Sequence, residues 1–350
     1  MGKMWHARFE ARHQEITART AQALSRPRNA VTKEGVTRYF FDLLKGVQGF
    51  ACTARDIYNV DETSFKTKGR TKRVVAVCGS KNVWRGEQTD SYHLTIVAAV
   101  AADGTPVPPA FILPGQSCAA TVLDKCPVSD AIVSASPKAF MNSDLFDSWL
   151  ERFGEWKLRE RDARPGVLVL DNCSSYLSIN SLPICEAYGI FVVRLPANST
   201  HLLQPLDVAL FRTFKRRIAQ GVTQRLQALN TISLPRDAAV QIAGEVFQAV
   251  FPTVDGDKFR NKAAENGFRT CGIWPLSLPK MLRRLAVAKA NSVQNGIGTE
   301  TWLKTKDHAR QDILTLPPVK KVRKRVPTAL EWHTRDALHA SAAKPVKRKK

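Results

Sequence analysis

Three aspartates stand at positions from which they could act together. Asp61 closes a short strand-like stretch, Asp171 directly follows a wholly apolar run, and Asp207 lies near the start of an amphipathic stretch. Hard divalent cations prefer oxygen ligands and keep several waters for substrate phosphates. Three carboxylates in one place therefore indicate a site for a pair of Mg²⁺ or Mn²⁺ ions held about 3.5–4 Å apart, and chemistry on a phosphate ester.

Each aspartate taken alone also has a simpler interpretation. Asp61 with Glu62, and Asp171 with Asn172, are residue pairs that commonly form turns. Asp207 could complement the positive end of a helix dipole from the first turn. The metal-site hypothesis therefore depends on whether the surrounding elements bring the three side chains together.

The strands predicted around Asp61 and Asp171 favour such a meeting. Runs rich in β-branched and apolar residues predict strands. The earlier strands along the chain are expected to be antiparallel, and the later ones to be buried in the centre of the sheet. Acids at the carboxyl ends of such strands meet in one crevice. The predicted strands are 57–61, 73–77, 92–100, 106–113, 167–170 and 190–195.

The helix that carries Asp207 is predicted to open at Pro205, a residue suited to a first helical turn. Asp207 shares the helical spacing of four apolar residues, so its carboxylate is expected to point towards the core. A charge there is costly unless it is paired or bound to metal. The apolar residues are Leu210, Phe211, Phe214 and Ile218. Other predicted helical segments are 36–44, 142–161, 176–188 broken by Pro183, and 238–250, with a tight aromatic turn over 267–275.

Composition limits the class of protein. The 350 residues are 44% hydrophobic, enough for a sizeable core, and 53 Lys and Arg against 31 Asp and Glu give a net charge of +22. Such an excess is typical of polyanion-binding proteins, although an inert basic surface is the alternative. The seven cysteines form no CxxC pair, and the longest apolar run, 94–102, is far shorter than a membrane span. We therefore expect a soluble intracellular protein with buried thiols and no membrane partner.

The two ends of the chain are also basic. The N-terminal residues 5–44 predict basic helices, which favours a DNA-contacting module or, equally, a solvated helical arm. Residues 318–350 hold eleven Lys and Arg and two Asp and Glu, and this tail is expected to be disordered. Its basic clusters, 320–325 and 347–350, are typical of nuclear-import signals or of phosphate-binding tails, so a nuclear location is predicted.

Three sequence blocks carry a family resemblance. The blocks 59–63 (NVDET), 170–175 (LDNCSS) and 203–207 (LQPLD) resemble the catalytic blocks of DDE superfamily endonucleases, specifically pogo-like transposases and their relatives jerky and centromere protein B. Thirty-five residues separate Asp171 from Asp207, which fits that family's spacing. The similarity covers roughly residues 56–278, and three blocks in order are far more specific than one.

The resemblance implies an α/β, RNase H-like fold, a mixed sheet flanked by helices. It places Asp61 on the first strand, Asp171 after the fourth and Asp207 on a helix. It also implies that these aspartates are catalytic and hold two Mg²⁺ or Mn²⁺ ions, that DNA is cleaved and strands are transferred, and that the protein could assemble as a homo-oligomer on DNA. Expected DNA contacts are Lys215, Arg216, Arg217, Lys320, Lys321, Arg323, Lys324 and Arg325.

The same resemblance allows a second hypothesis, a domesticated or inactive DNA-binding scaffold that keeps the fold without cleavage. Tyr176, where relatives commonly carry His, favours it, as does the loss of most of the upstream DNA-binding modules. The predicted organisation is a helix-turn-helix remnant and connector over 1–50, the endonuclease domain over 51–280, a helical or irregular extension over 281–316 and the basic tail over 317–350.

Overall fold

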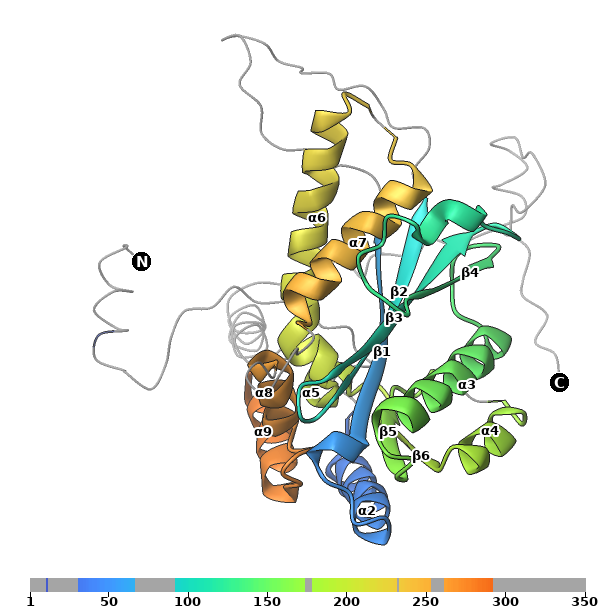
Figure 1. Ribbon diagram of the computed structural model, residues 1–350. Helices are drawn as coiled ribbons and strands as arrows, with labels where there is room; N and C mark the ends of the chain where they lie inside the picture. Colours follow the sequence, from blue (N-terminus) through green and yellow to red (C-terminus); the bar gives the residue numbers. More distant parts are fainter. Residues whose placement is uncertain are drawn as a thin grey trace, which may run out of the picture. The chain divides into compact units, whose positions relative to one another are not determined.

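The computed structural model describes residues 31–66, 92–173, 178–231, 233–252 and 261–291, together with Ala11 (Figure 1). The predicted strand 73–77, Tyr176 and the tail therefore lie outside the described residues. So do five of the expected DNA contacts, Lys320, Lys321, Arg323, Lys324 and Arg325.

A mixed sheet of six described strands forms the centre, in the order β4-β3-β2-β1-β5-β6. Strand β1 is antiparallel to β2, and β2 is antiparallel to β3, whereas β5 and β6 run parallel to β1. Strands β1, β2 and β3 are thus antiparallel, and the later strands β5 and β6 run parallel to β1 on its other side. This is the sheet of an RNase H-like fold, so the predicted fold class is confirmed. The strands are β1 (Ile57–Lys66), β2 (His93–Ala101), β3 (Pro106–Pro114), β4 (Ile132–Ser136), β5 (Gly166–Leu170) and β6 (Ile190–Arg194).

Two strand predictions were wrong in detail. Strand β1 continues to Lys66, so Asp61 lies in mid-strand opposite Ala98 of β2 and is not the closing residue of a strand or part of a turn. Strand β4 was not predicted, because its five residues are mostly half-buried and carry only a weak apolar pattern. It pairs parallel with β3, and Asp171 therefore follows the fifth described strand, not the fourth.

Helices cover both faces of the sheet (Figure 1). Helices α3 (Ser143–Glu160) and α4 (Ser181–Ala187) lie on one side, and α6 (Phe211–Ala228), α7 (Arg236–Val250), α8 (Lys262–Cys271) and α9 (Leu278–Asn291) lie on the other. Helix α2 (Lys33–Gly49) contacts β5 and β6. Consecutive residues of a strand point to opposite faces. Val167 and Val169 accordingly pack in the core with α2 and α6, whereas Leu168 and Leu170 pack in the core with α3. Because both faces of β5 are buried, its sequence is apolar throughout.

Two helical segments differ from the prediction. Helix α4 begins only at Ser181, so Pro183 sits in its first turn, where a missing N–H is tolerated, and does not interrupt a longer helix. Gly267 and Phe268 belong to helix α8, and the predicted turn begins after them at Gly272. Gly272 has φ +74°, a conformation that favours glycine.

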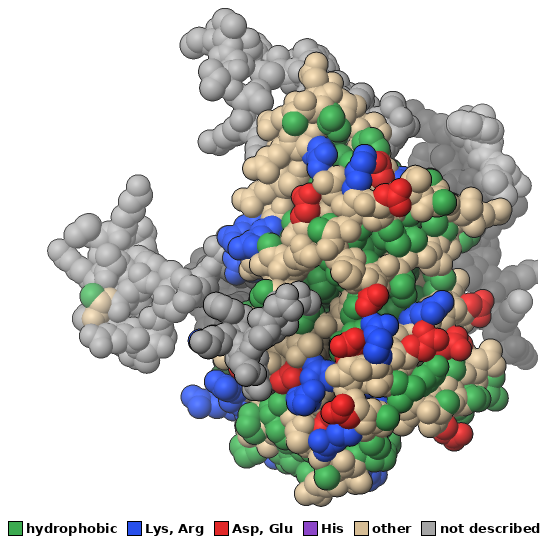
Figure 2. All heavy atoms as spheres, viewed as in Figure 1, with side chains coloured by type: hydrophobic (Ala, Val, Ile, Leu, Met, Phe, Trp, Pro, Cys, Tyr) green, Lys and Arg blue, Asp and Glu red, His purple; other side chains and the backbone are tan. Residues whose placement is uncertain are grey.

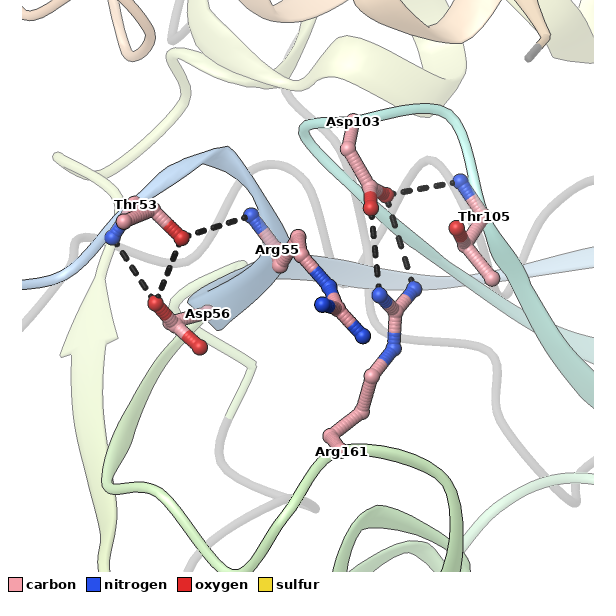
Figure 3. A network of polar contacts seen from close by, with 6 residues as sticks. All are labelled: Thr53, Arg55, Asp56, Asp103, Thr105 and Arg161. Carbon is pink, nitrogen blue, oxygen red and sulfur yellow. Dashed lines mark hydrogen bonds and ion pairs between the residues drawn. The ribbon is translucent and has the colours of Figure 1, made fainter. Parts of the chain in front are cut away.

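A buried ion pair fastens the end of α3 to the turn between β2 and β3 (Figure 3). Arg161, which follows α3, donates from Nη1 to Asp103 Oδ2 at 3.1 Å, and both side chains are 7% exposed. Asp103 Oδ1 also accepts the Thr105 backbone N–H at 2.9 Å. The Arg161 guanidinium lies 5.8 Å from the Trp156 ring centroid. This turn lies near the start of β1, at the end of the sheet away from Asp171, which follows β5.

Candidate active site

Asp207 lies in a π-helical turn that joins two helices. The short helix α5 (Thr200–Leu203) precedes the turn η4 (Leu206–Leu210), and α6 follows directly. Pro205 opens the turn in helical conformation, as predicted. Phe211, Phe214 and Ile218 are buried along α6, which confirms the apolar stripe.

The predicted direction of Asp207 was wrong, because this residue is exposed and does not point into the core. A π-helical turn closes on every fifth residue, so the 3.6-residue spacing of α6 does not extend back through η4. Asp207 therefore leaves the buried stripe and lies at the surface. An open position suits a group that must be reached by a substrate.

A buried polar pair fixes the turn against the sheet. Asn59 of β1 and Gln204, the residue before Pro205, are both 0% exposed. Asn59 Nδ2 donates to Val169 O of β5 at 3.0 Å and to Gln204 Oε1 at 3.2 Å, and Asn59 Oδ1 accepts the Leu206 N–H at 3.1 Å. One side chain thus ties β1, β5 and η4 together, and these three elements lead to the three aspartates.

Gln204 extends the pair towards Asp61. Its Nε2 donates to Val60 O at 3.1 Å, and its side chain also hydrogen-bonds the Asp61 carboxylate. On the other side of the turn, a Cβ at Gly267 of α8 would lie 3.0 Å from Pro205 O. Only glycine lets α8 pack this closely on η4, so the sheet and α8 hold the turn from two sides.

The charge of Asp207 acts on both other aspartates. The pKa of Asp61 is raised well above its usual range, first by burial, then by the Asp207 carboxylate and, more weakly, by Asp171. The Glu62 N–H donates to Asp61 Oδ1 at 2.8 Å and partly offsets this effect. Burial, followed by the charge of Asp207, also raises the pKa of Asp171, whose Oδ1 accepts the Cys173 N–H at 2.9 Å. Repulsion of this kind is what a bound cation would relieve.

The donor set has the right chemistry for a hard cation, because it consists of carboxylate oxygens, one of them exposed. Across the residues that the structure describes, however, no three His, Cys, Asp or Glu side chains converge tightly enough to define a metal centre. The expected ion spacing of about 3.5–4 Å is therefore not preformed in the positions of Asp61, Asp171 and Asp207.

Three expected DNA contacts lie within the described residues, on α6 after Asp207. Lys215, Arg216 and Arg217 are all exposed. Lys215 Nζ lies 5.7 Å from the Phe211 ring centroid, and Arg217 Nη1 donates to Ala249 O at 3.1 Å. Their role in DNA binding stays a prediction. The face shown in Figure 2 intersperses Lys and Arg with Asp and Glu, so no single-sign patch dominates it.

Sequence reasoning did not assign a role to Asn59 or Gln204, although both lie inside the quoted blocks. The available signal was an amide residue in an otherwise apolar strand and another just before a helical turn. Buried amides are almost always hydrogen-bonded, so each called for a partner. The sequence does not show that Asn59 and Gln204, which lie 145 positions apart, bind each other.

Replacing Asn59 by leucine is expected to destabilise the protein by about 2–3 kcal/mol, because the Leu206 N–H and Val169 O lose a buried partner. Urea unfolding measures this loss. Asn180→Leu is the matched control, since Asn180 is exposed and its side chain makes no capping hydrogen bond to α4. Equal stability of the two variants would show that the Asn59 network does not hold η4.

Part of the chain matches a known protein family. Residues 93–249 match the family model of the DDE superfamily endonuclease, a stretch that contains Asp171 and Asp207 but not Asp61. The resemblance predicted from the sequence is thereby confirmed for this stretch.

Two curated proteins are similar to the chain over part of their length. The chain is 23% identical over 262 residues to the human pogo transposable element with ZNF domain, which covers 70% of this chain and 17% of that protein. It is 24% identical over 235 residues to the MFS-type transporter clz9 of Cochliobolus lunatus, covering 66% of this chain and 24% of that protein. The chain thus spans a quarter or less of the length of these relatives. No helix among the described residues is both long and apolar enough to cross a membrane.

Solved structures with a similar arrangement come from the Mos1 mariner transposase. The paired end complex with Mn has a TM-score of 0.47 and 13% identity, covering 82% of this chain and 71% of that chain. The Mos1 catalytic domain has a TM-score of 0.35 and 11% identity, covering 69% of this chain and 94% of that chain.

Proposed function

We propose that this chain is the catalytic domain of a metal-dependent DNA transposase, which cleaves phosphodiesters and transfers strands in the nucleus. The observation that carries the proposal is the arrangement of β1, β5 and η4, which the Asn59 side chain ties together and which lead to Asp61, Asp171 and Asp207, so that the Asp207 charge acts on both other acids. The family match over 93–249 and the net charge of +22 support it. A fluorescent fusion that lacks residues 318–350 tests the nuclear location.

In this proposal Asp61, Asp171 and Asp207 would hold the two Mg²⁺ or Mn²⁺ ions. Such ions lower the pKa of a bound nucleophile and stabilise the leaving oxygen of an in-line displacement. The chain itself positions the acids: Asn59 and Gln204 fix the spacing between β1 and η4. The exposed Asp207 faces the incoming strand, and Lys215 and Arg216 on α6 contact its phosphates.

The proposed reaction has two steps, hydrolysis and strand transfer. A water oxygen attacks phosphorus, the bond from phosphorus to O3′ breaks, and the strand ends in a 3′-hydroxyl and a 5′-phosphate. In the second step that 3′-hydroxyl attacks a phosphorus of another DNA segment and displaces its 3′ oxygen. Both steps are in-line displacements at the same carboxylates, so one site serves both.

Nicking of supercoiled DNA, together with thermal unfolding with and without Mg²⁺ or Mn²⁺, tests this proposal on the wild type and Asp171→Asn. Metal at about 100 times its Kd stabilises a protein by about 2.7 kcal/mol, which raises the Tm of a domain this size by roughly 5–10 °C. We expect that rise in the wild type, a much smaller one in Asp171→Asn, and nicking only by the wild type.

Asp124→Asn is the control, because Asp124 is exposed and follows the short 3₁₀ helix Ala120–Leu123, away from the three acids. It should respond to metal and nick as the wild type does. The second candidate function, a DNA-binding scaffold without cleavage, is favoured by the lack of a preformed metal centre among the described residues. Equal metal responses in all three proteins, with no nicking, would establish the scaffold and end the transposase proposal.

A further inference from the structure

A groove of about 670 Å³ runs between helix α2 and the edge strand β6. Asn172, the neighbour of Asp171, lines one end of it, and Lys45 and Phe191 line it farther along α2 and β6. The groove therefore begins beside one of the three proposed catalytic acids and leads away from it.

The groove is positively charged. Three of its lining residues, Arg38, Lys45 and Arg194, are exposed cations. Asp42 is the acidic residue that lines it, and its carboxylate lies 3.8 Å from Lys45 Nζ. Within the part of the chain that the structure describes, Arg38 and Arg194 form no ion pair. Their charges are therefore available to an anionic ligand.

The groove also offers an aromatic surface and the positive end of a helix. Phe191 is half-buried in the groove wall, with its ring centroid 5.9 Å from that of Phe50. Thr32 and Gly35 line the groove at the start of the 17-residue helix α2, where the helix dipole favours negative charge. Sites that bind single-stranded nucleic acid combine cations along the path of the phosphate backbone with aromatic rings on which bases stack.

We infer that this groove holds a single nucleic-acid strand and leads it to or from the acids, with phosphates on Arg38, Lys45 and Arg194. The inference rests on the proposed function, because it names the path of that function's substrate. A pocket of this size encloses a drug-sized ligand, which corresponds to about two nucleotides of one strand and is too small for a duplex. The short distance in sequence from Asn172 to Asp171 connects the groove with the site of cleavage.

The test compares two double variants with the same change in net charge. Arg38→Gln/Arg194→Gln removes two groove cations. Lys262→Gln/Arg269→Gln removes two exposed cations of α8, which do not line the groove. Fluorescence anisotropy measures the binding of each protein to a 20-nucleotide single strand and to the matching duplex over a series of salt concentrations.

Each phosphate contact to a single strand contributes about 0.7 to the slope of log affinity against log salt. We expect the groove variant to lose about 1.4 from that slope and at least about tenfold in single-strand affinity at low salt. Its duplex affinity should fall less, and the α8 variant should bind the single strand almost as the wild type does. Equal losses in both double variants would show a general charge effect and overturn the inference.

Nicking separates a failure of the groove from a failure of the proposed function. A wild type that nicks DNA with metal, beside a groove variant with unchanged strand binding, would overturn the groove and leave the function standing. A wild type that binds the strand through the groove but does not nick DNA would overturn the proposed function and leave the groove as a strand-binding site. Binding of a polyglutamate peptide that is lost in the groove variant, with strand binding retained, would assign the groove to an acidic polypeptide instead.

Discussion

Replacing Asp61 by asparagine is expected to abolish metal-dependent cleavage and, at the same time, to make the metal-free protein more stable at neutral pH. The loss of activity should exceed about 100-fold, more than the loss of an outer-shell partner costs a metal site. The gain in stability follows because the folded protein disfavours the charged form of Asp61, through burial first and the Asp207 carboxylate second. Asparagine fills the same volume and removes that charge.

The pH dependence has a definite sign. The pKa of Asp61 is raised in the folded protein above its ordinary 3.8, so the folded state binds the proton more tightly than the unfolded state. This contribution to stability is fully present below about pH 4 and is lost as the pH rises through the folded-state pKa. The stability of Asp61→Asn does not fall in this way, because asparagine does not titrate. Its free energy of unfolding should therefore exceed that of the wild type by more as the pH rises.

Urea unfolding without metal at pH 4 and pH 8, beside nicking with Mn²⁺, measures both effects in the two proteins. Asp124→Asn serves again as the control for an exposed acid and should show neither effect. A variant at Asp61 that still nicks DNA at the wild-type rate would remove this residue from the catalytic set. A variant that is less stable at every pH would show that the carboxylate is a structural group.

Much of the fold follows from local patterns. The predicted strands 92–100 and 106–113 agree within one residue with β2 and β3, because apolar runs bounded by a turn at Asp103-Gly104 define their ends. The wholly apolar run 167–170 indicated a strand covered on both faces, and β5 is buried throughout. Strand β4 was not foreseen, because its place in the sheet depends on pairing with β3 and not on its own sequence.

The sequence nominated the residues of the candidate site, whose catalytic role stays a prediction, but not their geometry. The three blocks identified Asp61, Asp171 and Asp207, since acids after or within neighbouring strands meet at one region of a sheet. The direction of Asp207 was mistaken because a helical projection assumes a constant 3.6-residue period, and η4 departs from it. The Asn59–Gln204 pair depends on contacts between distant parts of the chain, which no local pattern encodes.

Replacing Arg161 by methionine is expected to cause the largest loss of stability, about 3–5 kcal/mol, because Asp103 would keep a buried charge without its partner. For a domain of this size the Tm should fall by roughly 6–20 °C. The matched control is Arg159→Met, on the same helix, whose ion pairs with Asp130 and Glu160 are half-exposed and should each contribute less than about 1 kcal/mol.

A second change at Asp103 separates the charge effect from a loss of packing. In Asp103→Asn/Arg161→Met the unpaired charge is gone, and the asparagine oxygen can still accept the Thr105 N–H. This double variant should therefore be more stable than Arg161→Met alone, and thermal unfolding of the four proteins measures the difference. If the double variant is as unstable as the single one, the lost packing of the Arg161 side chain, which includes its contact with Trp156, and not the lost ion pair, accounts for the loss of stability.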